Sequence, residues 1–174
     1  MPAQRNECVT LPAFLNCGDM ERDLRLEVAT VLFDRYKSVR VLGWNLSRIG
    51  IFVNSSLLLG FPNERQKPTL ICERSFQALI KLANKTVDAQ KIDNNISSED
   101  YTDLMTPLEL YETYPRVIVL GWSPTKIGLF LSSQLLVGYQ KGAGRSCYIT
   151  RMSFLRLMEH ANGTLDRRKI LLNP

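Results

Sequence analysis

Apolar residues recur along most of the chain at the three- and four-residue spacing that places them on one face of a helix. This spacing is clearest in the stretch from 22 to 36 and in a matching stretch from 102 to 114. Each stretch is followed by a Leu-Gly-Trp turn and then by a helix start, at Ser47 or at Ser123-Pro124. The predicted helices are 22–36, 49–53, 57–59 and 75–84, and in the second half 102–114, 127–131, 135–137 and 153–162.

Two short segments, 69–73 and 146–151, are predicted to be strands. In the second segment Cys147 and Ile149 fall on one face, and Ser146, Tyr148 and Thr150 fall on the other. We expect the two segments to pair antiparallel as one two-stranded ribbon on a helical body. Each follows a loop rich in Gly, Pro, Lys or Arg, and Asn162-Gly163 is predicted to end the second closing helix.

The predicted elements occur twice, at an offset of 78 residues and without a gap. Leu42-Gly43-Trp44 aligns with Leu120-Gly121-Trp122, and Ser75-Phe76 aligns with Ser153-Phe154. Such repetition predicts a tandem duplication in which the copies bury a shared face. The expected fold class is mainly α with a short antiparallel β-ribbon, built as a pseudo-twofold pair of helix-helix-helix-strand-helix units. The expected division is an arm at 1–20, units at 21–92 and 101–174 in one globule, and a polar linker at 93–100.

Composition narrows the class of protein. The chain has 174 residues and a net charge of +5, which favours anionic partners and above all nucleic acid. No apolar run is long enough for a membrane span and no leader pattern is present at the start, so a cytoplasmic location is expected. Four scattered cysteines and a single histidine, His160, suit neither a metal site nor a cofactor site.

Catalysis is not expected. Glu159 is next to His160 in sequence, and adjacent residues of a helix do not face each other. The only repeated carboxylates, Asp88 and Asp166, are better explained as helix caps or salt-bridge partners. The loop 141–145 lacks the spacing of a phosphate-binding P-loop. Trp44 and Trp122, which recur at equivalent positions, are predicted to be core residues.

From Ser146 on, a short strand is followed by the helix Ser153–Ala161, by Asn162-Gly163-Thr164 and by a further helical segment, Leu165–Leu172. This segment resembles the ribbon-helix-helix of Arc/MetJ-type repressors. In that family two strands enter the DNA major groove and the second helix holds a phosphate at its N-terminus. The resemblance implies that Ser146, Tyr148 and Thr150 read bases. It also implies a set of residues that contact the DNA backbone: Lys141, Arg145, Arg151, Thr164, Arg167, Arg168 and Lys169.

A whole unit is also similar to the FlhD subunit of the flagellar master regulator, through Leu42-Gly43, Leu57-Leu58 and Leu79. Relatives of that activator occur on conjugative plasmids and integrative elements. Both resemblances imply a sequence-specific regulator of transcription in a bacterial mobile or conjugative element. Double-stranded DNA is then the expected partner, with a homodimer or a second regulator subunit.

Two other functions stay open. A protein-interaction module, either a regulator subunit or an anti-host factor, would use its helical surfaces and need not bind DNA. A cyclic-dinucleotide sensor is suggested only by the motif from Asn45 to Gly50, and the Arg-x-x-x-Arg that such a site needs is not suitably placed before it.

Overall fold

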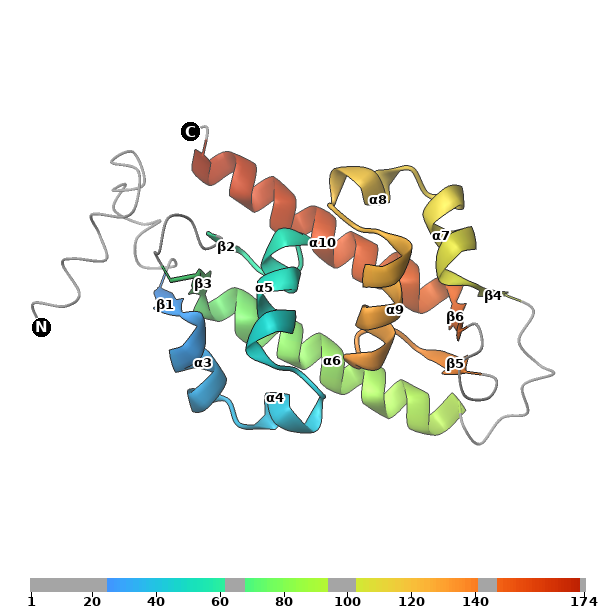
Figure 1. Ribbon diagram of the computed structural model, residues 1–174, viewed down its shortest axis with the longest axis horizontal. Helices are drawn as coiled ribbons and strands as arrows, with labels where there is room; N and C mark the ends of the chain where they lie inside the picture. Colours follow the sequence, from blue (N-terminus) through green and yellow to red (C-terminus); the bar gives the residue numbers. More distant parts are fainter. Residues whose placement is uncertain (1–24, 62–67, 94–102, 141–146, 173–174) are drawn as a thin grey trace, which may run out of the picture.

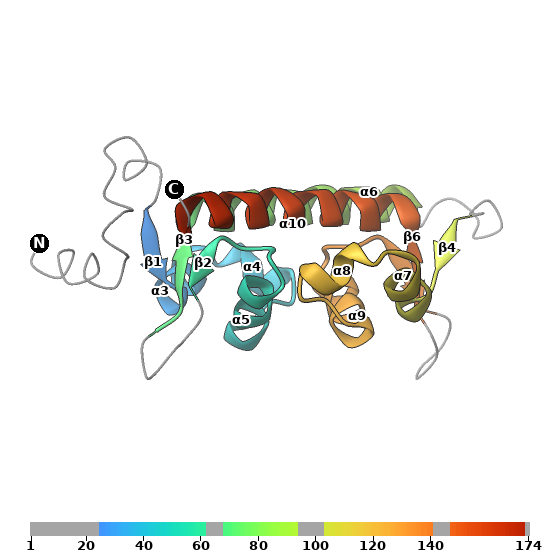
Figure 2. The same ribbon diagram turned by 90° about the horizontal axis from the view of Figure 1, so that it is seen from above.

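The computed structural model describes residues 25–61, 68–93, 103–140 and 147–172. In these residues the chain is mainly helical, with eight helices and two three-stranded antiparallel sheets. The two longest helices form one layer, and the shorter helices form the other (Figure 2). None of the described helices combines the length and apolar character needed to cross a bilayer.

The first half runs from a strand through three short helices into a hairpin and a long helix. Its elements are β1 (Leu26–Val28), α3 (Ala29–Arg35), α4 (Ser38–Val41), α5 (Leu46–Asn54), β2 (Gly60–Phe61), β3 (Leu70–Cys72) and α6 (Glu73–Asp93).

The second half repeats this order. Its elements are β4 (Leu104–Met105), α7 (Pro107–Thr113), α8 (Arg116–Val119), α9 (Pro124–Ser132), β5 (Gly138–Gln140), β6 (Cys147–Thr150) and α10 (Arg151–Leu172). Each half is therefore strand-helix-helix-helix-strand-strand-helix, which has two more strands than the predicted unit. The long helices α6 and α10 run in opposite directions (Figure 1).

Both predicted strands are confirmed, as β3 and β6, but the predicted pairing between them is wrong. The strand order is β1-β3-β2 in one sheet and β4-β6-β5 in the other, so each predicted strand lies between two strands of its own half. The two sheets lie at opposite ends of the molecule (Figure 1). Pairing within a half closes shorter loops than pairing across halves, and it leaves neither β3 nor β6 with a free edge.

Several predicted helix boundaries are wrong. Residues 26–28 and 104–105 are strands, whereas the helical spacing had included them. Residues 57–59 and 135–137 are not helical, because Ser56 and Gln134 take positive φ values of 60° and 63° just after α5 and α9. Helix α6 continues to Asp93, where the linker was expected to begin.

The predicted stop at Asn162-Gly163 is also wrong, because α10 runs through it to Leu172. The buried stripe of this helix continues past the glycine, with Leu157 and Ala161 before it and Thr164 after it. The Thr164 hydroxyl donates to the carbonyl of His160, one helical turn back, at 3.2 Å. Burial of one continuous face outweighs the local preference of Asn-Gly to end a helix.

Equivalent residues of the two halves meet in the core. The Trp44 indole N–H donates to the Ser133 carbonyl, and the Trp122 indole N–H donates to the Ser55 carbonyl, each at 2.7 Å. The rings of Phe52 and Phe130 pack with their centroids 6.2 Å apart. Both tryptophans are buried, as predicted, and one continuous cluster of apolar side chains joins the halves.

Candidate functional site

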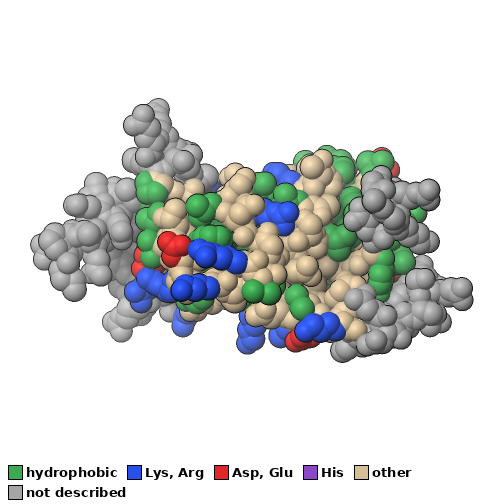
Figure 3. Space-filling view, turned by 60° about the horizontal axis from the view of Figure 1, so that its bottom comes forward, with side chains coloured by type: hydrophobic (Ala, Val, Ile, Leu, Met, Phe, Trp, Pro, Cys, Tyr) green, Lys and Arg blue, Asp and Glu red, His purple; other side chains and the backbone are tan. Residues whose placement is uncertain are grey.

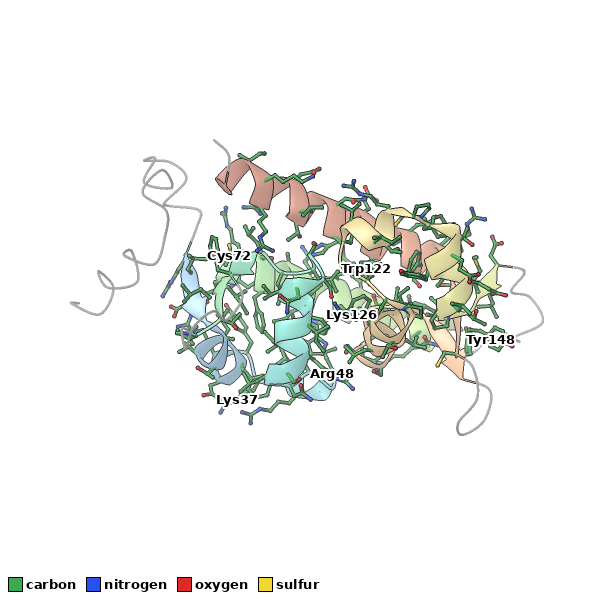
Figure 4. The ribbon with its side chains drawn as sticks, turned by 45° about the horizontal axis from the view of Figure 1, so that its top comes forward. Lys37, Arg48, Cys72, Trp122, Lys126 and Tyr148 are labelled. Carbon is green, nitrogen blue, oxygen red and sulfur yellow. The ribbon has the colours of Figure 1, made fainter. Side chains whose placement is uncertain are left out.

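The residues predicted to read DNA bases do not form a ribbon. Ser146 lies outside the described residues, together with Lys141 and Arg145. Tyr148 and Thr150 are half-buried on the central strand β6, and the Thr150 hydroxyl donates to the Ser153 hydroxyl at 2.8 Å. Cys72 of β3 and Tyr148 of β6 lie at opposite ends of the molecule (Figure 4). Insertion of a paired ribbon into a major groove is therefore excluded, because the two strands do not meet.

The predicted contacts to the DNA backbone are spread along α10. Arg151, Arg167 and Lys169 are exposed, and Arg168 is half-buried. Arg151 and Arg167 are separated by about 24 Å of helix at 1.5 Å per residue, so they do not form one cluster. The helix start predicted near Thr164, which was to hold a phosphate, is wrong, because this buried residue lies inside α10.

The sequence prediction missed a helix-turn-helix in each half. Helix α4 is joined to α5 by the four residues from Leu42 to Asn45, and the equivalent turn joins α8 to α9. A short turn that contains glycine between two helices is typical of this motif, and here the first helix, α4 or α8, has four residues. Gly43 and Gly121 both have a φ of +81°, which glycine adopts more readily than other residues. The sequence marked these turns and the helices that follow them, but it did not predict the short helices α4 and α8 that precede them.

Side-chain caps fix where the second helix of each motif begins. The Asn45 side-chain oxygen accepts from the Arg48 backbone N–H at 2.8 Å, and the Ser123 hydroxyl accepts from the Lys126 backbone N–H at 3.2 Å. These bonds satisfy amides that have no partner within the helix. The first turn of α5 is accessible, because Ser47 is exposed and Leu46 is 45% exposed.

Cationic side chains occur in the first turn of α5 and on the segment before it. Lys37 and Arg40 are exposed on the segment just before it, and Arg40 forms a surface ion pair with Asp34 at 3.3 Å. Arg48 extends from α5 itself, and Figure 4 shows Lys37 and Arg48 on the same side of the first half. In Figure 3, Lys and Arg side chains outnumber acidic ones over the face turned to the viewer. In the second half Arg116 and Lys126 occupy the corresponding region, although Arg116 donates to Asn162 at 2.7 Å.

Helices α5 and α9 lie side by side and antiparallel. The Arg48 guanidinium, in the first turn of α5, donates to the Gly43 carbonyl at 2.9 Å. It also reaches the Ser132 carbonyl and the Ser133 hydroxyl, at the end of α9, at 3.4 and 3.2 Å. The N-terminus of one second helix therefore lies at the C-terminus of the other.

A groove of about 610 Å³ is lined mainly by residues of α6 and α10. These two helices form the layer opposite α5 and α9 (Figure 2). Leu82, Ala89, Leu135 and Val137 form its apolar part. Its charged lining residues are Lys85, Arg156, Glu159 and Arg167.

His160 also lines this groove. Its Nε2 lies 3.2 Å from the Leu57 carbonyl, which can only accept, so this nitrogen carries the hydrogen. Burial lowers the pKa of His160, and the bond to the carbonyl offsets this only in part. The imidazole is therefore neutral near pH 7 and adds no charge to the groove.

Ionisable side chains also connect the start of α6 to the end of α3. The Glu73 carboxylate accepts from the Arg35 guanidinium at 2.7 Å and from the Tyr36 hydroxyl at 2.8 Å. Burial raises the pKa of Glu73, but the hydrogen bonds from Tyr36 and Arg35 outweigh it and lower the pKa overall. Such a carboxylate stays ionised and paired, which suits a structural contact rather than proton transfer.

The described residues contain no group of three His, Cys, Asp or Glu side chains placed to hold a metal ion. Comparison with protein-family models, with curated proteins and with solved structures found no match to this chain. Functional interpretation therefore depends on the helix-turn-helix pairs, on the charge around them and on the groove.

Proposed function

We propose that the chain is a regulator of transcription that binds double-stranded DNA through α4 and α5. The observation that carries this proposal is a helix-turn-helix whose second helix has an exposed, cation-flanked first turn. In DNA-binding proteins with this motif, the first turn of the second helix contacts base edges and the first helix crosses the backbone. Ser47 is then the base-contacting group, and Lys37 and Arg40 neutralise phosphates. The resemblance of Leu42-Gly43, Leu57-Leu58 and Leu79 to FlhD-like activators implies the same function.

The first half is the better DNA-binding half. Lys37 and Arg40 are exposed before the first turn of α5, and Arg40 pairs with Asp34 only at the surface, whereas the equivalent positions of the second half are Pro115 and Ile118. The exposed Ile118 and Val119 of α8 offer no charge to a phosphate. We therefore assign base contacts to α5 rather than to α9 or to β6.

We further propose that the two halves arose by tandem duplication and are related by a pseudo-twofold axis. The reciprocal bonds of Trp44 and Trp122 support this relation. Successive major grooves on one side of a duplex are about 34 Å apart, whereas α5 and α9 are in contact. One chain therefore reads one half-site, and an inverted-repeat operator requires two chains, as in a homodimer.

The test is the binding of a labelled duplex of random sequence, measured by fluorescence anisotropy over a range of salt concentrations. We expect tighter binding at low salt and a straight fall of log affinity with log salt. The double variant Lys37→Ala, Arg40→Ala should bind at least tenfold more weakly. Its salt slope should be smaller by about 2, because each lost phosphate contact removes about 0.9.

The matched control is Lys81→Ala with Arg156→Ala. It removes the same charge from α6 and α10, on the other layer, and should leave DNA binding nearly unchanged. Circular dichroism checks that both double variants keep the fold. An absence of binding at low salt, or an equal loss in both variants, would refute the assignment to α4 and α5.

A protein-interaction function is favoured by a different observation, the groove between α6 and α10. Its apolar side chains have no partner in a DNA-binding function. The two functions are compatible, because the groove and α5 lie on opposite layers.

A further inference from the structure

We propose that the groove between α6 and α10 binds an acidic amphipathic helix of a partner protein. This inference does not depend on the proposed DNA binding, because none of Lys37, Arg40 and Ser47 lines the groove. It follows from the shape of the groove, from its apolar floor and from the charge along its sides.

The apolar lining residues form the floor of the groove, and two of them are spaced as on one face of a helix. Leu82 and Ala89 of α6 are half-buried and two turns apart, which corresponds to about 10.5 Å along the helix. Leu135 and Val137, just before β5, lie against the same space and are themselves buried. A partner helix that binds in a groove presents apolar side chains at positions i, i+3 or i+4, and i+7. Its side chains at i and i+7 are as far apart as Leu82 and Ala89 of α6, so both can make contact.

The two halves line the groove differently at one equivalent position. Gly163 of α10 stands where the first half has Lys85 of α6, and both residues line the groove. A Cβ atom added at Gly163 would meet nothing within 4 Å. The second half therefore leaves free space at the position where the first half places a long side chain.

The charge of the lining selects an acidic partner. Lys85 comes from α6, and Arg156 and Arg167 come from α10, whereas Glu159 is the single acidic lining residue. Within the described ranges, these three cations take part in no ion pair. Carboxylates on the polar face of a bound helix would pair with them while its apolar face covers Leu82 and Ala89.

An amphipathic helix fits these features better than a nucleic acid does. A phosphate backbone would neutralise Lys85 and Arg156 but would leave Leu82 and Ala89 facing water. Binding energy at a nucleic-acid backbone comes mainly from neutralised phosphates. A helix with one apolar and one acidic face uses both parts of the groove.

The probe is a fluorescein-labelled designed peptide of about six helical turns, with leucines on one face and glutamates on the other. Two control peptides keep the length, one with lysines in place of the glutamates and one with serines in place of the leucines. Anisotropy at physiological salt should show saturable binding of the acidic amphipathic peptide to the full chain. Both control peptides should bind at least tenfold more weakly.

Variants then locate the binding site. Lys85→Glu with Arg156→Glu should weaken binding of the acidic peptide at least tenfold, and Ala89→Trp should do so by filling the floor. Lys81→Glu with Lys169→Glu makes the same charge change on the same helices outside the groove, and it should have little effect. Because Ala89→Trp can disturb packing, its melting temperature is measured, and the charge pairs decide the question if it unfolds.

Three results would overturn the proposal. The first is an equal loss of binding in the two charge-reversed pairs, which would indicate general attraction to a basic surface. The second is equal binding of the acidic and the lysine peptides. The third is displacement of the peptide by a random DNA duplex whose own affinity falls in Lys85→Glu, Arg156→Glu, which would make the groove a nucleic-acid site.

Discussion

Equivalent tyrosines in the two halves have different surroundings. The Tyr36 hydroxyl donates to Glu73 at 2.8 Å and accepts from the Gln77 amide at 2.6 Å. The hydroxyl of Tyr114 is buried and has no hydrogen-bond partner in the described part of the chain. The reason lies in the sequence, because Arg151 and Leu155 occupy the positions of Glu73 and Gln77. The same scaffold therefore carries a satisfied polar group in one half and an unsatisfied one in the other.

We predict that Tyr36→Phe lowers the free energy of unfolding by about 1 to 2 kcal/mol, because it removes two hydrogen bonds, one of them to a carboxylate. Tyr114→Phe should leave this energy unchanged or raise it slightly, since it removes a hydroxyl that has no partner. Urea denaturation of both variants measures the difference. In a Leu155→Gln background, Tyr114→Phe should become destabilising. Equal losses for the two single variants would contradict the structural difference.

At the scale of single elements, the sequence was informative where the signal is local. The alternation at Cys147–Thr150 predicted β6, and the apolar spacing after it predicted the start of α10 to within a few residues. The prediction of which strand pairs with β6 was wrong, because alternation shows which face of a strand is buried but does not identify the neighbouring strand. The predicted end of α10 was wrong, because the Asn-Gly signal was considered alone, without the apolar face of the helix that continues beyond it.

The candidate sites were less predictable than the elements. The Leu-Gly-Trp repeat was visible, but a helix-turn-helix also requires that residues 38–41 form a helix, and four residues carry no helical period. The groove combines α6, the turn before β5 and α10, which are distant in sequence and meet only through the packing of the two halves. Leu82, Leu135 and Val137 were visible only as members of predicted helices, and Ala89 lay beyond the predicted end of its helix.

The continuity of α10 makes a prediction about Gly163. This glycine lies inside the helix, is exposed and has room for a Cβ atom. Gly163→Ala should therefore raise the free energy of unfolding by about 0.5 to 1 kcal/mol. Gly121→Ala is the contrasting variant and should destabilise, because Gly121 has a φ of +81° and a Cβ there would lie 2.7 Å from the Asn54 carbonyl oxygen. A loss of stability in Gly163→Ala would mean that the helix breaks at Asn162-Gly163.

At the scale of the whole molecule, each half completes the core of the other. Trp44 and Trp122 bond to carbonyls across the interface, and Phe52 packs on Phe130. Separation would leave two indole N–H groups and two buried carbonyls without partners, and would expose the largest side chains of the core. The halves are therefore expected to unfold together, although their strands pair separately.

This coupling is tested by Phe52→Ala, which removes a fully buried ring from the first half alone. The substitution should lower the free energy of unfolding by about 3 to 5 kcal/mol. Because the ring supports both halves, hydrogen exchange should accelerate by a similar factor in the central turns of α6 and of α10. Circular dichroism and tryptophan fluorescence should then report one shared transition. If α10 kept its protection while α6 lost it, the halves would be independent domains, and the joint groove between their long helices would not survive as a stable binding surface.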